Sequence, residues 1–118
     1  KLPSDCTALV WGQPLMGRQP DDPPNEKLEP LPVAWVKDWK TSGGKTARVF
    51  HTTMGSGTDL KSAGLRRLII NAAYWGMGLE PAISATRSVE IVGDYQPLGS
   101  GFNYEELGVK PRPVSHYR

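Results

Sequence analysis

The chain has 118 residues, which is enough for one compact domain and too few for two independent cores. Its 14 Lys and Arg residues nearly balance its 12 Asp and Glu residues, so the formal net charge is only +2 and predicts no nucleic-acid partner. No apolar run approaches the ~18 residues that a membrane span needs, and no membrane partner is expected.

The single cysteine, Cys6, excludes an intrachain disulfide and a cysteine-rich zinc site, and neither a metal nor a cofactor is predicted. Thirteen Gly and 11 Pro residues are a high share for a compact domain and predict long loops or tails. The first residue is Lys1, so the sequence leaves open what precedes it and in which compartment the protein works.

The first half of the chain has the pattern of strands joined by irregular segments. Residues 5–11 are apolar and β-branched and predict a strand, whereas residues 12–32 hold six prolines and predict a long loop. Residues 33–39 and 47–53 then predict two strands of a hairpin, because a Ser-Gly-Gly turn lies between them. Their mixed apolar pattern is typical of strands that are covered on both faces.

The second half predicts one helix and a tail. A helix is expected from Thr58 or Asp59, either of which would be its N-cap, to about Gly78, and its wide apolar arc suits a cover on the sheet. We expect only Arg66, Arg67 and Asn71 of this helix to face water. Beyond it, residues 88–92 could form a short strand, and the rest of the segment is assigned no part in the core.

One local segment could bind a ligand, namely the turn over residues 50–59 that joins the second hairpin strand to the helix. Open α/β sheets gather ligands where a strand ends and a helix begins, and the glycines permit close backbone approach. The candidate ligand-binding residues are Gly55, Ser56, Gly57 and Asp59. The alternative is an ordinary strand-to-helix connection, because a lone G-x-G is neither a phosphate nor a dinucleotide motif.

Three residue types allow a functional and a structural interpretation. His51 is the candidate acid–base group, but a lone strand histidine is more often a hydrogen-bonded core or rim residue. His116, in the polar tail, is expected to be solvated. Cys6 fits a buried inert thiol better than a nucleophile. The four tryptophans could stack on sugars, although packing in the core accounts for most of them.

Three blocks of the sequence, taken together and in order, resemble the closing part of a ThuA-like (trehalose-utilisation) domain of the class I glutamine amidotransferase-like superfamily. These blocks are PVAWVK at residues 32–37, GKTARVFHTTMG at 44–55 and LRRLIINAAYWGMGLE at 65–80. The resemblance implies the later half of a flavodoxin-like three-layer sandwich. It divides the chain into a partial domain over residues 1–80 and a C-terminal extension over 81–118, with a weaker likeness as far as residue 111.

The same resemblance limits the chemistry. Amidotransferases of this class end the last core strand in F-H-P-E, and here Thr52 and Thr53 follow Phe50 and His51, so the orienting carboxylate is missing. Cys6 lacks the flanking glycines of the nucleophile turn. Many ThuA-like proteins also carry a histidine shortly after the final strand, where this chain has Ser56.

Two functions are therefore expected. The first is that of a ThuA-like fragment in bacterial carbohydrate utilisation, acting on trehalose or keto-sugars, with its enzymatic activity undecided. The second is a non-catalytic binding or assembly module of a larger protein. The expected partners are a carbohydrate-derived small molecule and the missing N-terminal half of the domain or a partner chain, which would cover exposed sheet edges and an apolar helix face.

Overall fold

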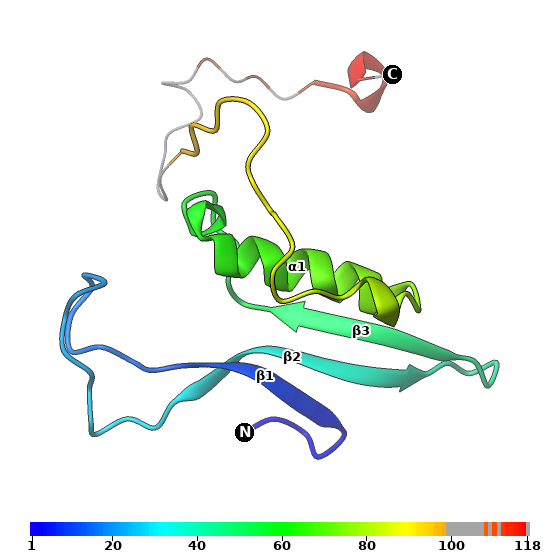
Figure 1. The fold of residues 1–118 in the computed structure, drawn as a ribbon, viewed down its shortest axis with the longest axis horizontal. Coiled ribbons are helices and arrows are strands. Elements are labelled where there is room, and N and C mark those ends of the chain that lie inside the picture. The colour runs from blue at the N-terminus through cyan, green and yellow to red at the C-terminus, as the bar shows by residue number, and fades with distance from the viewer. Residues whose placement is uncertain (99–107, 109, 111, 118) are drawn as a thin grey trace.

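The computed structural model describes residues 1–98, 108, 110 and 112–117 (Figure 1). It contains a three-stranded sheet and one α-helix, so the chain is a mixed α/β protein. The predicted strand, long loop, hairpin and helix are all confirmed. The bounds are β1 at Cys6–Gly12, β2 at Leu31–Lys40, β3 at Thr46–Thr52 and α1 at Ala63–Gly76, with short 3-10 turns at Asp59–Lys61, Glu80–Ala82 and Val114–Tyr117.

The sheet is antiparallel throughout, in the order β1-β2-β3. The β2–β3 hairpin is regular from Ala34 opposite Thr52 to Lys40 opposite Thr46. Gly44, at φ +76°, lets the chain reverse in the turn, where the amide of Thr41 donates to the carbonyl of Lys45 at 2.8 Å. Because neighbouring strands run in opposite directions, the carboxyl ends of β2 and β3 lie at opposite ends of the sheet.

The β1–β2 pairing is less regular, with register shifts on both sides of Val10. Pro32, which was expected in the loop, lies inside β2 at one of these irregular positions. Proline has no backbone N–H to donate, and the ladder of hydrogen bonds is already interrupted there. The intervening loop is partly ordered: Leu15 bridges Pro24, and the side-chain amide of Gln13 donates to carbonyls of the returning chain.

The helix α1 starts later than predicted. Its N-cap is Ser62, whose hydroxyl accepts from the amide of Leu65 at 3.4 Å, and not Thr58 or Asp59. Asp59 instead begins the separate 3-10 turn. The extended backbone of Ser62 separates this turn from the α-helix, because an N-cap residue needs non-helical dihedral angles.

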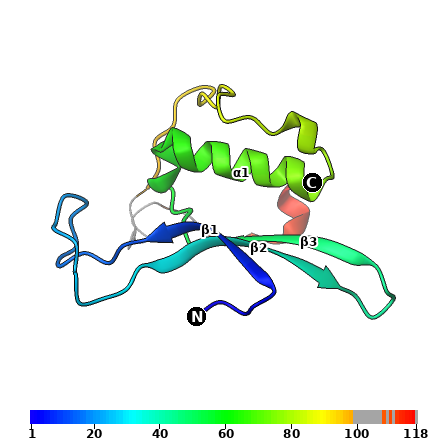
Figure 2. The ribbon, with the colours of Figure 1, turned by 60° about the horizontal axis from the view of Figure 1, so that its bottom comes forward.

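The molecule has two layers, and α1 covers only one face of the sheet (Figure 2). Of the three strands, β3 lies closest to α1, and Arg48 of β3 connects the two by donating to the carbonyl of Trp75 and pairing with Glu80. The expectation that both faces would be covered is wrong for the described residues. The opposite side, here called the open face, carries Cys6, Ala8, Trp35, Lys37, Trp39, Ala47, Val49 and His51.

The segment after α1 lies along the helix and contributes to the core. Arg66 donates to the carbonyl of Val89 at 2.7 Å, and the Asn71 side chain exchanges two hydrogen bonds with the backbone of Ser84. Val89 itself is buried. Three predictions are therefore wrong: residues 88–92 form no strand, the segment does contribute to the core, and the polar residues of α1 do not simply face water. The side chains of Arg66, Arg67 and Asn71 instead hydrogen-bond to the backbone of the segment that packs on the helix.

The core is small for a chain of this length. Among the described residues only Ala34, Leu65 and Val89 are buried apolar residues, and no large side chain is fully buried. Residues 99–107, 109, 111 and 118, which include much of the predicted tail and the end of the family likeness, lie outside the described residues.

Candidate functional site

His51 lies on the open face of the sheet, opposite to α1. Its ring stacks on that of Trp35, its cross-strand partner, with centroids 3.9 Å apart and an angle of 23° between the rings. His51 is exposed and lines none of the five best-formed hollows among the described residues. The histidine is therefore neither packed beneath the helix nor held in a concave pocket.

The chemistry open to His51 depends on what surrounds the ring. Within the described residues no carboxylate forms an ion pair with it, so no group orients the imidazole as a general base. The stacked pair of Trp35 and His51 instead forms a small planar surface that faces solvent, which suits contact with another flat or apolar surface.

The four candidate ligand-binding residues form a loop that binds itself. The carboxylate of Asp59 accepts from the amides of Gly55 and Ser56, both at 3.0 Å, and the hydroxyl of Ser56 lies 3.1 Å from that of Thr58. These amides are the donors that were expected to hold an anionic ligand. The side chain of Asp59 already occupies the position that such an anion would take.

This geometry lowers the pKa of Asp59, first through the amides of Gly55 and Ser56 and then through the Ser56 hydroxyl. Gly57 has a different role, because its carbonyl accepts from the hydroxyl of Tyr95 at 2.7 Å and an added Cβ would meet Pro97 at 3.0 Å. Gly57 thus allows close packing against Pro97, and Gly55 adopts a positive φ of 143° that other residues rarely adopt.

The structure does not bring the histidine and the loop into one site. Met54, which connects them, lies on the helix side of the sheet beside Ser62 and Leu65. His51 lies on the open face. The other histidine, His116, is exposed in the last 3-10 turn beside Arg112.

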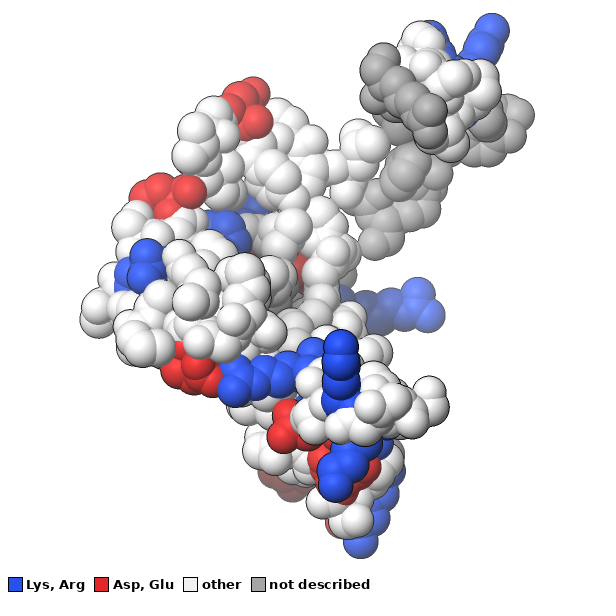
Figure 3. Space-filling view, turned by 90° about the vertical axis from the view of Figure 1, so that its right-hand side faces the viewer, with Lys and Arg blue, Asp and Glu red and all other residues white. Residues whose placement is uncertain are grey.

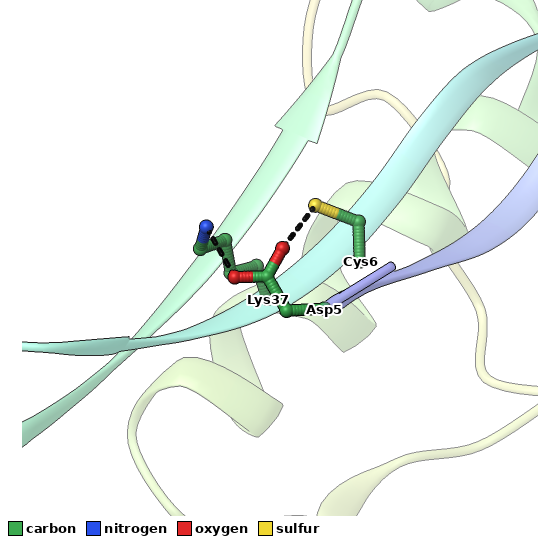
Figure 4. A network of polar contacts seen from close by, with 3 residues as sticks. All are labelled: Asp5, Cys6 and Lys37. Carbon is green, nitrogen blue, oxygen red and sulfur yellow. Dashed lines mark hydrogen bonds and ion pairs between the residues drawn. The ribbon is translucent and has the colours of Figure 1, made fainter. Parts of the chain in front are cut away.

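A polar cluster that sequence reasoning missed joins Asp5, Cys6 and Lys37 (Figure 4). The Lys37 ammonium lies 2.7 Å from the Asp5 carboxylate, whose other oxygen accepts from the Cys6 thiol at 3.7 Å. Lys37 lowers the pKa of Asp5, and Asp5 raises the pKa of Lys37. Cys6 is half-buried, which corrects the expectation of a buried thiol. Lys37 lies opposite it on β2, and only the strand register could have indicated this neighbour.

Two strongly apolar hollows lie between the sheet and α1 rather than at His51. One of about 270 Å³ has Leu9 and Val36 as its floor and Leu68 and Trp75 as its wall. Another of about 320 Å³ lies beyond β3, between Phe50 and α1. These hollows are open gaps beside a single helix and contain few polar groups, so they suit packing rather than catalysis.

The part of the chain that the structure describes contains no larger cluster of metal-binding side chains and no membrane-spanning helix. No group of three or more His, Cys, Asp or Glu side chains could hold a metal ion there. Nor do the described helices include one with the length and apolar character needed to cross a bilayer. Comparisons with protein-family models, with curated proteins and with solved structures found no match to this chain.

Proposed function

We propose that this chain is a non-catalytic assembly module, the later part of a ThuA-like domain whose third layer is supplied by another segment or chain. The observation that carries the proposal is the open face of the sheet. Trp39 and Val49 on this face are 54% and 42% exposed, and no described helix covers them. Large apolar side chains gathered on one exposed face are typical of an interaction surface.

The total exposed surface is large for a chain of this mass. The chain exposes 9632 Å², whereas a compact monomer of this mass exposes about 6,300 Å². Its radius of gyration is 18.2 Å, compared with about 13–14 Å for a compact domain of this length.

Charge does not oppose such packing. The ammonium of Lys37 is neutralised by Asp5, and no other charged residue belongs to the open face. Figure 3 shows basic and acidic side chains interspersed on the side of the molecule where the β2–β3 hairpin turns. A neutral face bordered by mixed charges favours an apolar partner layer over a charged ligand.

The experiment measures whether the open face is covered in the natural protein. In a Cys6→Ser background, Trp39→Cys on the open face and Thr41→Cys in the hairpin turn are labelled with a maleimide, in the isolated chain and in the natural protein. We expect labelling at position 39 to slow by at least about tenfold in the natural protein, as for a site that opens only transiently, while position 41 stays reactive. Equal rates at position 39 in both would contradict the proposal.

A second candidate function is carbohydrate binding, the activity that the ThuA-like resemblance implies. It is favoured by the stacked pair of Trp35 and His51, because an aromatic surface suits the apolar face of a sugar ring. Titration of trehalose or a keto-sugar should change tryptophan fluorescence, and His51→Ala should weaken this response. A turnover in the natural protein that is unchanged by His51→Ala would exclude a catalytic role for His51.

A further inference from the structure

The two edges of the sheet differ in their readiness to pair with another strand. The outer edge of β1 is interrupted by the register shifts beside Val10, and the amide of Cys6 is already bonded to the carbonyl of Pro3. Bulges of this kind discourage pairing at an edge. β3 has no such irregularity: its seven residues pair in unbroken register with β2.

The outer side of β3 is open. Five of its seven residues are exposed, and no described residue outside β2 hydrogen-bonds to its backbone. β3 also contains no proline, and Arg48, its only Lys or Arg, is held on the helix side by Glu80 and Trp75. A regular edge without these protections is a template for another strand.

The space beyond this edge has the shape that an added strand requires. The hollow of about 320 Å³ is lined on the sheet side by Arg48 and Phe50, which both belong to β3, and on the other side by α1. Ala73 and Gly76 are the small residues of this wall. Side chains from a neighbouring strand could therefore fill the hollow, and small helix residues leave room for a second helix to approach.

One register lets a second copy of the chain pair along the whole of this edge. Antiparallel pairing about a two-fold axis at Val49, the centre of β3, uses the full length of both strands. It places Arg48 opposite Phe50 of the second copy, and Ala47 opposite His51. No like charges face each other, whereas an axis at Arg48 would oppose two guanidinium groups.

We propose that two copies of this chain pair through their β3 edges to form a continuous six-stranded antiparallel sheet. The inference rests on the proposed role of the chain as an assembly module and names a partner for it. It assigns the β3 edge to a second copy, whereas the family resemblance would assign the sheet edges to the missing half of the domain. The third layer of the proposed function concerns the open face.

The test measures self-association by analytical ultracentrifugation over a range of concentrations. We expect the wild-type chain to form a dimer. Val49→Glu should raise the dissociation constant at least about tenfold, because two carboxylates would face each other across the axis. Within one chain Glu at this position lies opposite Lys37, which should preserve the fold, as circular dichroism would verify.

A charge exchange makes the test specific. An equimolar mixture of Val49→Glu chains and Val49→Lys chains should restore the dimer, because opposite charges then meet at the axis. The Val49→Lys chain also carries Lys37→Gln, because a lysine at position 49 would otherwise lie directly opposite Lys37. Trp39→Glu is the matched control, since it places the same charge on the open face but on the central strand. This variant should remain dimeric.

Several outcomes would overturn the inference: a wild-type chain that stays monomeric at all concentrations, a Val49→Glu dimer, or a mixture of the two charged variants that stays monomeric. Dissociation by Trp39→Glu alone would place the contact on the open face, which overturns edge pairing but supports the assembly module. Conversely, the chain could dimerise through β3 while position 39 is labelled at equal rates in the isolated chain and in the natural protein. That result would contradict the proposed third layer on the open face and leave the edge pairing supported.

Discussion

Asp59 illustrates how a residue chosen for ligand binding can serve the loop itself. Its carboxylate accepts hydrogen bonds from the amides of Gly55 and Ser56, and an external anion would need these same donors. A carboxylate held by backbone donors fixes the path of the chain from β3 towards α1. The loop is thus a completed structural unit, and the sequence motif alone could not distinguish its own carboxylate from a foreign anion.

The charge of Asp59 should make stability depend on pH. The amides lower its pKa below the ordinary value of 3.8. A carboxylate whose pKa is lower in the folded state stabilises the fold above its unfolded pKa, and this contribution is lost as pH falls through the folded pKa. Between about pH 5 and pH 2 the urea midpoint of the wild type should therefore fall more than that of Asp59→Asn. Parallel curves for the two proteins would show that the loop does not depend on this charge.

At the scale of elements, the helix α1 depends on a cap that the sequence pattern placed too early. Ser62→Ala removes the hydroxyl that accepts from the Leu65 amide, and we expect a loss of about 1 kcal/mol in the free energy of unfolding. Ser62→Asp should restore most of it, because aspartate also caps. Urea denaturation measures both, and Ser88→Ala, at an exposed serine, is the matched control. Equal stability of Ser62→Ala and the wild type would exclude the cap.

The segment after α1 depends on Asn71. Its side chain satisfies both the amide and the carbonyl of Ser84. Asn71→Ala leaves these half-buried groups unpaired, and we expect a loss of about 1–3 kcal/mol. Hydrogen exchange over residues 82–90 should rise more than exchange within β2. Asn25→Ala, in the proline-rich loop, is the control that should leave residues 82–90 unchanged, and an equal rise with both variants would contradict the role of Asn71.

At the scale of the whole molecule, the small core should weaken the cooperativity of unfolding. With 9632 Å² exposed, the monomer buries only about half of the surface of its unfolded chain, where a compact protein of this mass would bury about two thirds. The urea m-value scales with the surface exposed on unfolding. It should therefore be roughly three quarters of the value for a compact domain of equal length, measured at concentrations where the chain is monomeric. An m-value typical of a compact domain would contradict this account.

The sequence by itself determined the elements of this protein, because apolar periodicity, proline and glycine act locally. It located three strands, the hairpin turn and the helix to within a few residues. It failed for the helix start, because Ser62 rather than Thr58 or Asp59 is the N-cap. It also failed for residues 82–90, because side chains of α1 rather than solvent bind the backbone of this segment.

Only the tertiary structure decided which residues meet. The register of the sheet placed His51 on Trp35, Cys6 beside Lys37 and the candidate loop on the other side of the sheet from the histidine. Such contacts depend on strand pairing between residues far apart in the chain, and shifting a register by one residue moves every side chain to the opposite face. Residue types therefore predicted elements, whereas the pairing of those elements decided which face of the sheet, and the regular edge of β3, the described residues leave uncovered.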